Sequence, residues 1–156
     1  TGITSEDNSN KKLQQAAEGF GLKMLQYNVT GPSDLVESFA KAEGAGVDAL
    51  LFGSDSVFQN NRQKVIALAA RHKLPAMYAI PEFGSDGGLI SYGTNYTDAY
   101  RQVGEFVGHV LKGEKPENLP VQQVTKIELV INTKTAKSLG LKVPLALLGR
   151  ADEVIE

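Results

Sequence analysis

The sequence predicts an α/β domain in which a parallel sheet carries helices on both faces. Amphipathic helical segments alternate with short apolar segments along most of the chain, which is the order of right-handed βαβ units. The segment VDALLF, residues 47–52, is almost continuously apolar, as expected for a parallel strand covered on both sides. With 156 residues, of which 42% are hydrophobic, the chain is long enough for one sizeable core.

The first third of the chain predicts two helices with a strand between them. A helix from about residue 10 ends at Gly21, and the segment LKMLQYNV, 22–29, is predicted as a strand because turn residues bound it. Ser33 or Asp34 then caps a second helix. The apolar positions that predict the buried stripes of these two helices are Leu13, Ala16, Ala17 and Phe20, and then Leu35, Val36, Phe39 and Ala42.

The middle of the chain continues the alternation. A third helix is predicted over residues 56–72, a strand over 75–80, a second strand over 89–93 and a long helix over 95–112. A glycine-rich loop, 82–88, separates the two strands. The buried stripes are predicted to be Phe58, Val65, Ile66, Leu68 and Ala69 in the third helix, and Tyr96, Ala99, Tyr100, Val103, Val107 and Val110 in the long helix.

The last segments predict an exposed connection, a strand and a short helix. Charge and two prolines replace periodicity over residues 112–123, which indicates an exposed connection. The segment KIELVIN, 126–132, alternates apolar and polar residues as a strand does, and residues 133–139 follow as a helix.

Composition and motifs exclude several functional classes. Sixteen basic residues against eighteen acidic ones give a net charge of −2, without the basic footprint of a nucleic-acid-binding protein. The absence of cysteine excludes disulfides and thiol catalysis. The pattern formed by Gly44, Gly46 and Ala49 resembles a dinucleotide loop, but it ends a predicted helix and opens a strand, so it is interpreted as structural.

The two histidines predict neither a metal site nor a catalytic base. His72 lies in the last turn of a predicted helix beside Arg71 and Lys73, where it complements the helix dipole, and His109 is predicted on a solvated helix face. Neither has acidic or histidine partners at ligand spacing in the sequence. No catalytic residue, metal or cofactor is therefore expected.

Two strand-to-helix turns predict a ligand cleft. GSDSVF, 53–58, and SYGTNY, 91–96, each follow a predicted strand and open a helix, which is where open α/β sheets bind ligands. Tyrosines in the second turn suit a small ligand with a planar apolar part and charged ends. The alternative for the first turn is structural, because Ser54 or Asp55 also makes a good helix cap.

Long stretches of the chain resemble the ABC-transporter substrate-binding proteins of the tryptophan-type or uncharacterised periplasmic component family. The resemblance runs in order from about Leu13 to the end. It is carried by GSDSVF (53–58), LAARHKLPAMY (68–78), the block from GGLISYG to ENLP (87–120), TKIELVINTKTAKSLGLKVP (125–144) and RADEVIE (150–156).

The resemblance implies a type I periplasmic-binding fold, in which two α/β lobes close on a ligand. Residues 1–86 and 125–156 would form the second, C-terminal lobe, and 87–124 would be an excursion belonging to the first lobe, most of which is absent from this chain. An excursion without its neighbours must pack elsewhere, and a homodimer formed by segment exchange is one way to do so.

The resemblance also implies the binding residues. Asp55 would face the ligand, and the start of the following helix would receive an anionic group. Family members often have Pro and Thr before this aspartate, where the chain has Gly53 and Ser54, so the ligand's identity stays open. The residues expected to contact ligand are Ser54, Asp55, Ser56, Phe58, Phe83, Tyr92, Asn95 and Tyr96.

The function expected on these grounds is non-enzymatic. The protein would bind a small polar or aromatic solute, including amino acids, in the periplasm or another extracytoplasmic space, and would deliver it to a membrane permease. Two alternatives stay open. The effector-binding domain of a transcription regulator uses the same fold, and a small flavodoxin-like enzyme shares the α/β pattern but would need a nucleophile-base pair or phosphate loop that the sequence lacks.

Overall fold

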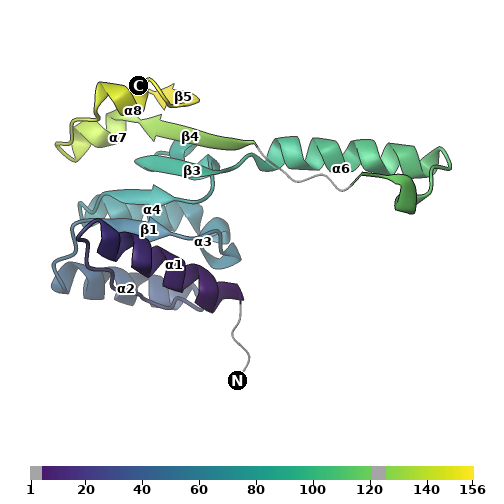
Figure 1. The fold of residues 1–156 in the computed structure, drawn as a ribbon. Coiled ribbons are helices and arrows are strands. Elements are labelled where there is room, and N and C mark those ends of the chain that lie inside the picture. Colours follow the sequence, from purple (N-terminus) through teal and green to yellow (C-terminus); the bar gives the residue numbers. More distant parts are fainter. Residues whose placement is uncertain (1–4, 121–125) are drawn as a thin grey trace.

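A five-stranded sheet with the strand order β1-β2-β3-β4-β5 forms the centre of the molecule. The computed structural model describes residues 5–120 and 126–156. The strands are β1 (Leu50–Phe52), β2 (Ala76–Tyr78), β3 (Ile90–Thr94), β4 (Ile127–Asn132) and β5 (Glu153–Ile155). Figure 1 shows this sheet with helices packed around it, which confirms the predicted α/β class.

The sheet is mixed, whereas the sequence predicted a parallel one. β1, β2 and β3 run parallel, and so do β4 and β5, but β4 lies antiparallel to β3. The reason is the path of the chain. β3 leads out of the body, the chain turns, and β4 returns directly beside β3, so that Thr94 pairs with Ile127. An outgoing and a returning strand that lie side by side are necessarily antiparallel.

Helices of very different length connect these strands. Before β3 the structure has α1 (Ser5–Gly19), α2 (Pro32–Gly44), α3 (Ser56–Asn60), α4 (Arg62–Arg71) and α5 (Glu82–Ser85). The predicted third helix is thus divided in two. The division lies at Asn61, whose amide Nδ2 donates to the carbonyl of Val57 over 2.8 Å and so closes the end of α3.

The second half of the chain has fewer helices. These are α6 (Tyr96–Leu111), the 3₁₀ turn η1 (Pro116–Asn118), α7 (Thr133–Ser138) and α8 (Leu145–Leu148). The start of α7 is set by Asn132, whose Oδ1 accepts from the amide of Thr135 over 2.9 Å. Residues 121–123 of the predicted connection lie outside the described residues.

The core lies between one face of the sheet and helices α2, α4 and α5. Helices α2 and α4 bury Leu35, Phe39, Val65 and other apolar side chains that the sequence predicted. Aromatic rings fill the centre, because Tyr78 stacks on Phe52 at 5.2 Å and on Phe83 at 4.4 Å between ring centroids. Such pairs add about 0.5–1.5 kcal/mol each beyond their buried area.

The opposite face of the sheet is partly uncovered at β1 and β2. Leu51 and Met77 are cross-strand neighbours, and 57% and 36% of their surfaces are exposed. The prediction that residues 47–52 are covered on both faces is therefore wrong at Leu51. Leu13 of α1 and Phe20, directly after its end, are exposed, so the predicted stripe of this helix is not used to cover the sheet.

The strand predicted at residues 22–29 is not formed. The segment makes no ladder with another described strand, although Tyr27 and Val29 pack against the core. Turn residues and β-propensity indicate a segment that fits an extended conformation, but a strand also needs a neighbouring backbone in register. The local sequence indicates the extended conformation, but it does not indicate whether a neighbouring backbone lies in register.

Helix α6 forms as predicted, but its predicted buried stripe is exposed. None of its described residues is buried, and Figure 1 shows the helix projecting from the end of the β3–β4 pair, away from the other helices. Tyr100 is 74% exposed and Val107 is 51% exposed. An amphipathic pattern indicates that a helix has an apolar face, and the described residues of this chain leave that face of α6 exposed.

Gly93 is the point where the chain leaving β2 passes closest to β3. A Cβ atom at Gly93 would lie 1.8 Å from the carbonyl oxygen of Ala79 and 2.6 Å from its carbonyl carbon. Both contacts are with backbone, which cannot rotate away. Gly93 therefore lets the loop after β2 cross against β3 at this edge of the sheet.

We predict that Gly93→Ala destabilises this chain by about 3 kcal/mol or more, because backbone must move to admit the methyl group. Thermal unfolding by circular dichroism measures the effect. The control is Gly104→Ala in α6, where a Cβ would have no atom within 4 Å. Alanine has a higher helix propensity than glycine in a helix interior, so this control should raise the free energy of unfolding by up to about 1 kcal/mol. Equal effects of the two changes would contradict the close approach at Gly93.

Candidate functional site

Three chain segments leave the sheet at the same edge. β1, β2 and β3 are parallel neighbours, so the residues that follow them, 53–55, 79–81 and 95–96, leave the sheet at one edge. Adjacent strands lie about 4.8 Å apart. β3 continues past Ser91, the partner of Tyr78, to Thr94, so its exit lies farther out than those of β1 and β2. This edge is where parallel α/β sheets place ligands.

Asp55 caps α3 and still has a free acceptor. Its Oδ1 accepts from the amide of Val57 over 2.7 Å, which is the capping role that the sequence offered as an alternative. Among the described residues, the structure records no partner for its second oxygen, Oδ2. Ser54 and Ser56 on either side are exposed. A cap and a ligand contact are therefore compatible at Asp55.

The start of α3 offers little to an anionic ligand. The helix has five residues, and the amide of Val57 is already bonded to Asp55. A helix dipole develops over several aligned turns, and here there is little more than one. We therefore do not propose that the amides at this helix start bind a ligand carboxylate.

Asn95 links the beginning of α6 to the returning strand. Its Oδ1 accepts from the amide of Asp98 over 2.8 Å, and its Nδ2 donates to Glu128 Oε1 over 2.7 Å. Lys126 Nζ lies 3.0 Å from the same carboxylate oxygen. The hydrogen bond from Asn95, followed by that from Lys126, holds the pKa of Glu128 below its ordinary value. Asn95 thus has a structural role at this junction.

The aromatic residues predicted for the site divide into two groups. Tyr92 in β3 is 51% exposed, and Tyr96 and Phe58 are partly buried against the edge of the core. Phe83 is only 1% exposed because its ring is stacked on Tyr78. The expectation that Phe83 contacts ligand is corrected, since its ring is a core component.

Glu82 is a candidate that the sequence prediction missed. It follows the exit of β2 as the first residue of α5, and its Oε2 is buried without a hydrogen-bond partner among the described residues. A buried carboxylate oxygen without a partner costs free energy unless something outside the described residues satisfies it. In the sequence, Glu82 could have been identified as an acidic residue directly after an apolar strand and a proline.

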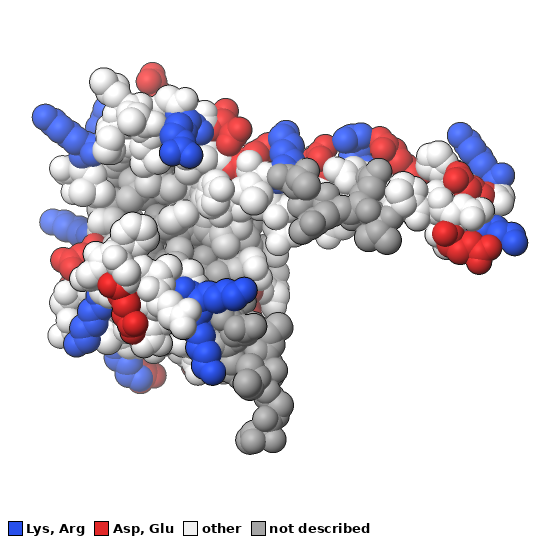
Figure 2. Space-filling view, in the orientation of Figure 1, with Lys and Arg blue, Asp and Glu red and all other residues white. Residues whose placement is uncertain are grey.

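Potential metal-ligating groups do not cluster in the described part of the chain. On the face drawn in Figure 2, acidic and basic side chains are interspersed over the body and α6. His72 Nδ1 lies 2.7 Å from Glu43, and His109 Nδ1 lies 2.7 Å from Glu114. Within residues 5–120 and 126–156, no group of three or more potential metal ligands occurs. No described helix combines the length and apolar character needed to span a bilayer.

The chain matches a family model almost from end to end. The family is described as ABC transporter substrate binding protein, and the match covers residues 3–155. A curated relative, the tyrosine-binding protein of Clostridioides difficile (strain R20291), is 24% identical over 142 residues. That alignment covers 89% of this chain and 41% of the relative.

Solved structures share the fold. The ABC domain in complex with L-Trp from Streptococcus pneumonia is 28% identical, with a TM-score of 0.81 over 97% of this chain and 52% of that one. A conserved domain protein from Vibrio cholerae O1 biovar El Tor has the same TM-score at 24% identity, covering 94% of this chain and 49% of that one. The chain therefore spans about half the length of the relatives that it matches.

We predict that acid weakens the junction between α6 and β4. The pKa of Glu128 is lowered in the folded state, so its contribution is present above its ordinary pKa of 4.5 and is lost as pH falls through the folded-state value. The pKa of Asp98 is also lowered, mainly by its hydrogen bond from Arg101, so protonation of Asp98 lowers the folding stability further in acid. Glu128→Gln should lower the melting temperature at pH 7 and reduce, without abolishing, the further loss between pH 5 and pH 3.

The matched control for this change is Glu156→Gln at the end of the chain, which should leave the acid-induced loss as it is in the unchanged protein. Melting curves by circular dichroism at a series of pH values measure both variants. An acid-induced loss in Glu128→Gln as large as in the unchanged protein would contradict the role given to the Asn95–Glu128–Lys126 contact.

Proposed function

The chain belongs to the ABC transporter substrate-binding protein family, and from that premise we propose that it forms part of a receptor for an amino acid with an aromatic side chain. The observation that carries the proposal is the pair of relatives with stated ligands. One is named for tyrosine, and the other was solved with L-Trp, and each aligns with nearly all of this chain.

The strand exits supply chemistry that suits an amino acid. Asp55 has one carboxylate oxygen without a recorded partner, and a ligand ammonium is a suitable donor for it. Tyr92 exposes half of its surface and lies two residues before the end of β3, where an aromatic side chain of the ligand would find a stacking partner. Tyr96 is a second aromatic contact at the same turn.

Glu82 adds a second acidic group at this edge. Its buried Oε2, which has no partner among the described residues, is the kind of oxygen that a ligand donor, or a donor from a first lobe, would satisfy. Ser54 and Ser56 provide hydroxyl groups beside Asp55. Together these residues would form one wall of the site, with the other wall contributed by chain outside this sequence.

We further propose that residues 87–124 belong to the first lobe of a two-lobed protein, and that the second lobe consists of residues 1–86 and 125–156. Two observations support this division. The exposed apolar stripe of α6 is unusual for a finished protein surface, and the relatives are about twice as long as this chain. The stripe consists of Tyr100, Val103, Val107, Val110 and Leu111.

The β3–β4 pair would then cross between the lobes. The segments that join two lobes absorb the rotation when they close on a ligand. In this proposal the protein performs binding and closure without a chemical step. It works outside the cytoplasm and delivers its ligand to a membrane permease.

The binding proposal is tested by isothermal titration of the intact protein with L-tyrosine, L-tryptophan and L-leucine. We expect saturable binding of the aromatic amino acids, with leucine weaker by about tenfold or more. Asp55→Ala should weaken binding by about tenfold, which is about 1.4 kcal/mol, and should lower the stability by about 1 kcal/mol through the lost cap.

The control is Asn132→Ala, since Asn132 also caps a helix, its Oδ1 accepting from the amide of Thr135. Its neighbour Ile131 pairs with Ile90 at the start of β3, on the edge opposite the strand exits, so ligand affinity should not change. If Asp55→Ala lowers the melting temperature and leaves affinity unchanged, the aspartate is only a cap. If no amino acid binds, the aromatic amino acid proposal is wrong.

The division into lobes is tested with Val107→Asp. In the intact protein we expect a loss of about 2–3 kcal/mol, because a charge would enter a packed interface. In the 156-residue chain, where Val107 is exposed, the change should stay within about 0.5 kcal/mol. Chemical denaturation measures both, and Glu105→Gln on the polar side of α6 is the control.

The alternative partner for the α6 stripe is a second copy of the chain, in a segment-exchanged homodimer. Sedimentation of the 156-residue chain distinguishes the two, since a concentration-dependent dimer that Val107→Asp dissociates would identify a copy as the partner. An intact monomeric protein that tolerates Val107→Asp without loss would contradict the division into lobes.

A further inference from the structure

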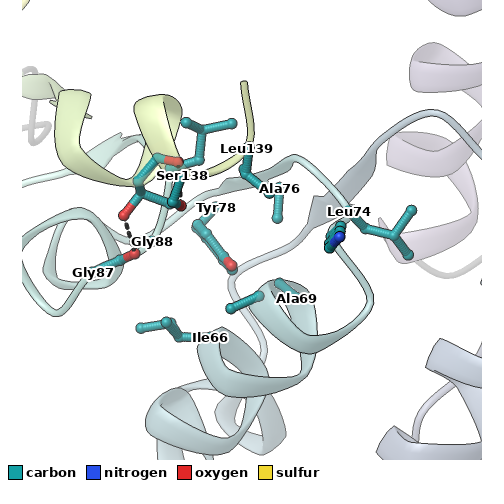
Figure 3. Close-up of a pocket in the computed structure, with 13 residues that line it drawn as sticks. Ile66, Ala69, Leu74, Ala76, Tyr78, Gly87, Gly88, Ser138 and Leu139 are labelled. Carbon is teal, nitrogen blue, oxygen red and sulfur yellow. Dashed lines mark hydrogen bonds between the residues drawn. The ribbon is translucent and has the colours of Figure 1, made fainter. Parts of the chain in front are cut away.

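A hollow in the structure has a lining different from the residues proposed for the strand-exit site. It has a volume of about 290 Å³ and lies between α4 and α7, with the turn at Gly87 and Gly88 as one side (Figure 3). Leu74 and Leu89 line it, and they precede β2 and β3, so the hollow lies at the amino ends of these strands. Its volume is close to the lower end of the range for small-molecule pockets, roughly 300–1,000 Å³.

Most of the lining is apolar. Ile66 and Ala69 of α4 form one wall, and Leu139 after α7 contributes the other. The hydroxyl protons on the α7 side are already used, because Thr135 donates to the carbonyl of Gly87 and Ser138 donates to the carbonyl of Thr135, both over 2.8 Å. An apolar ligand body would therefore meet no unsatisfied donor along these walls.

Tyr78 brings an unpartnered hydroxyl to this apolar space. The residue is 1% exposed, and the structure records no hydrogen bond from its hydroxyl to any described residue. Figure 3 shows the hydroxyl end of the side chain pointing into the hollow, on the side of α4. Burial raises the pKa of Tyr78, so the hydroxyl keeps its proton and acts as a neutral donor.

The core fixes the position of this donor. The Tyr78 ring is stacked between Phe52 and Phe83, and a Cβ at Gly88 would lie 2.6 Å from its Cε2 atom. The ring therefore cannot turn the hydroxyl away without disturbing the aromatic stack. Among the described residues, the buried side-chain atom without a partner belongs to Glu82, so the Tyr78 hydroxyl is accessible from the hollow and can donate to an acceptor that enters there.

The rim of the hollow carries one positive charge. Lys73 is exposed and is the charged residue among those that line the hollow, and the described residues form no ion pair with it. Its backbone has the left-handed φ of +52° that ends α4 and turns the chain at this rim. The available donors are therefore a deep neutral hydroxyl and an ammonium at the mouth.

We propose that the hollow between α4 and α7 is a second ligand site, for a small carboxylic acid with an apolar body. The body would lie against Ile66, Ala69 and Leu139, an oxygen would accept from Tyr78, and Lys73 would favour the anion at the mouth. The site is distinct from the proposed strand-exit site, because its lining includes none of residues 53–58 and 92–96. The competing occupant is water, which would satisfy Tyr78 without selecting a ligand.

The test is a methyl NMR titration of the intact protein with sodium benzoate, and separately with benzyl alcohol as its uncharged counterpart. We expect saturable shifts of the Ile66 and Leu139 methyl groups, with a dissociation constant in the millimolar range or tighter. Tyr78→Phe should weaken benzoate binding at least fivefold. Lys73→Gln should weaken benzoate and leave benzyl alcohol unchanged.

Two further measurements separate this site from the cleft and from folding defects. Ser138→Phe places a ring at an exposed position of the rim and should abolish the shifts, whereas Lys142→Gln, an exposed lysine outside the lining, should not affect them. The titration is repeated at saturating L-tryptophan, and the shifts should persist. The proposal would be overturned if no saturable shift occurred up to about 20 mM benzoate, which is about tenfold above the dissociation constant of a weak pocket. Shifts that survive Ser138→Phe would also overturn it.

Discussion

The close approach between Gly93 and the Ala79 carbonyl is the constraint on which the rest of the structure depends. Because no side chain intervenes, the chain leaving β2 can cross directly against β3 before α5 begins. That crossing lets three strand ends emerge together at one edge and lets α5 pack on β3 and β4 from the core side. A single methyl group at residue 93 would separate elements that the proposed binding wall requires to be adjacent.

The sequence predicted the elements better than their environments. The helices α2, α6 and α7 and the four longer predicted strands after residue 46 follow from local periodicity and turn residues, which is information that a few neighbouring residues contain. The missing ladder at 22–29, the exposed Leu51 and the exposed stripe of α6 depend on what lies opposite, which no local pattern states. Phe83 was expected to contact the ligand as an aromatic residue, and its stacking on Tyr78 depends on a ring from another segment that the local sequence does not reveal.

An aromatic row links the turn after β1 to the hollow between α4 and α7. Phe58, three residues after Asp55, meets Phe52 edge-on at 5.2 Å, and Phe52 stacks on Tyr78, which also lines the hollow. The same buried rings thus support the strand-exit edge and position the donor of the proposed second site. Substitutions in this row would disturb both places together, whereas changes at Asp55 or Ser138 act at one place only.

Helix α6 is also a mechanical lever. Sixteen helical residues rise about 1.5 Å each, so the helix is roughly 24 Å long, and it is attached to the body through the β3–β4 pair. A change of about 10° in the twist of that pair would move the far end of α6 by roughly 4 Å, given this length. Small adjustments near Gly93 and the Asn95–Glu128 contact are therefore amplified at the far end of the helix, so the stiffness of two paired strands sets how accurately a distant surface is positioned.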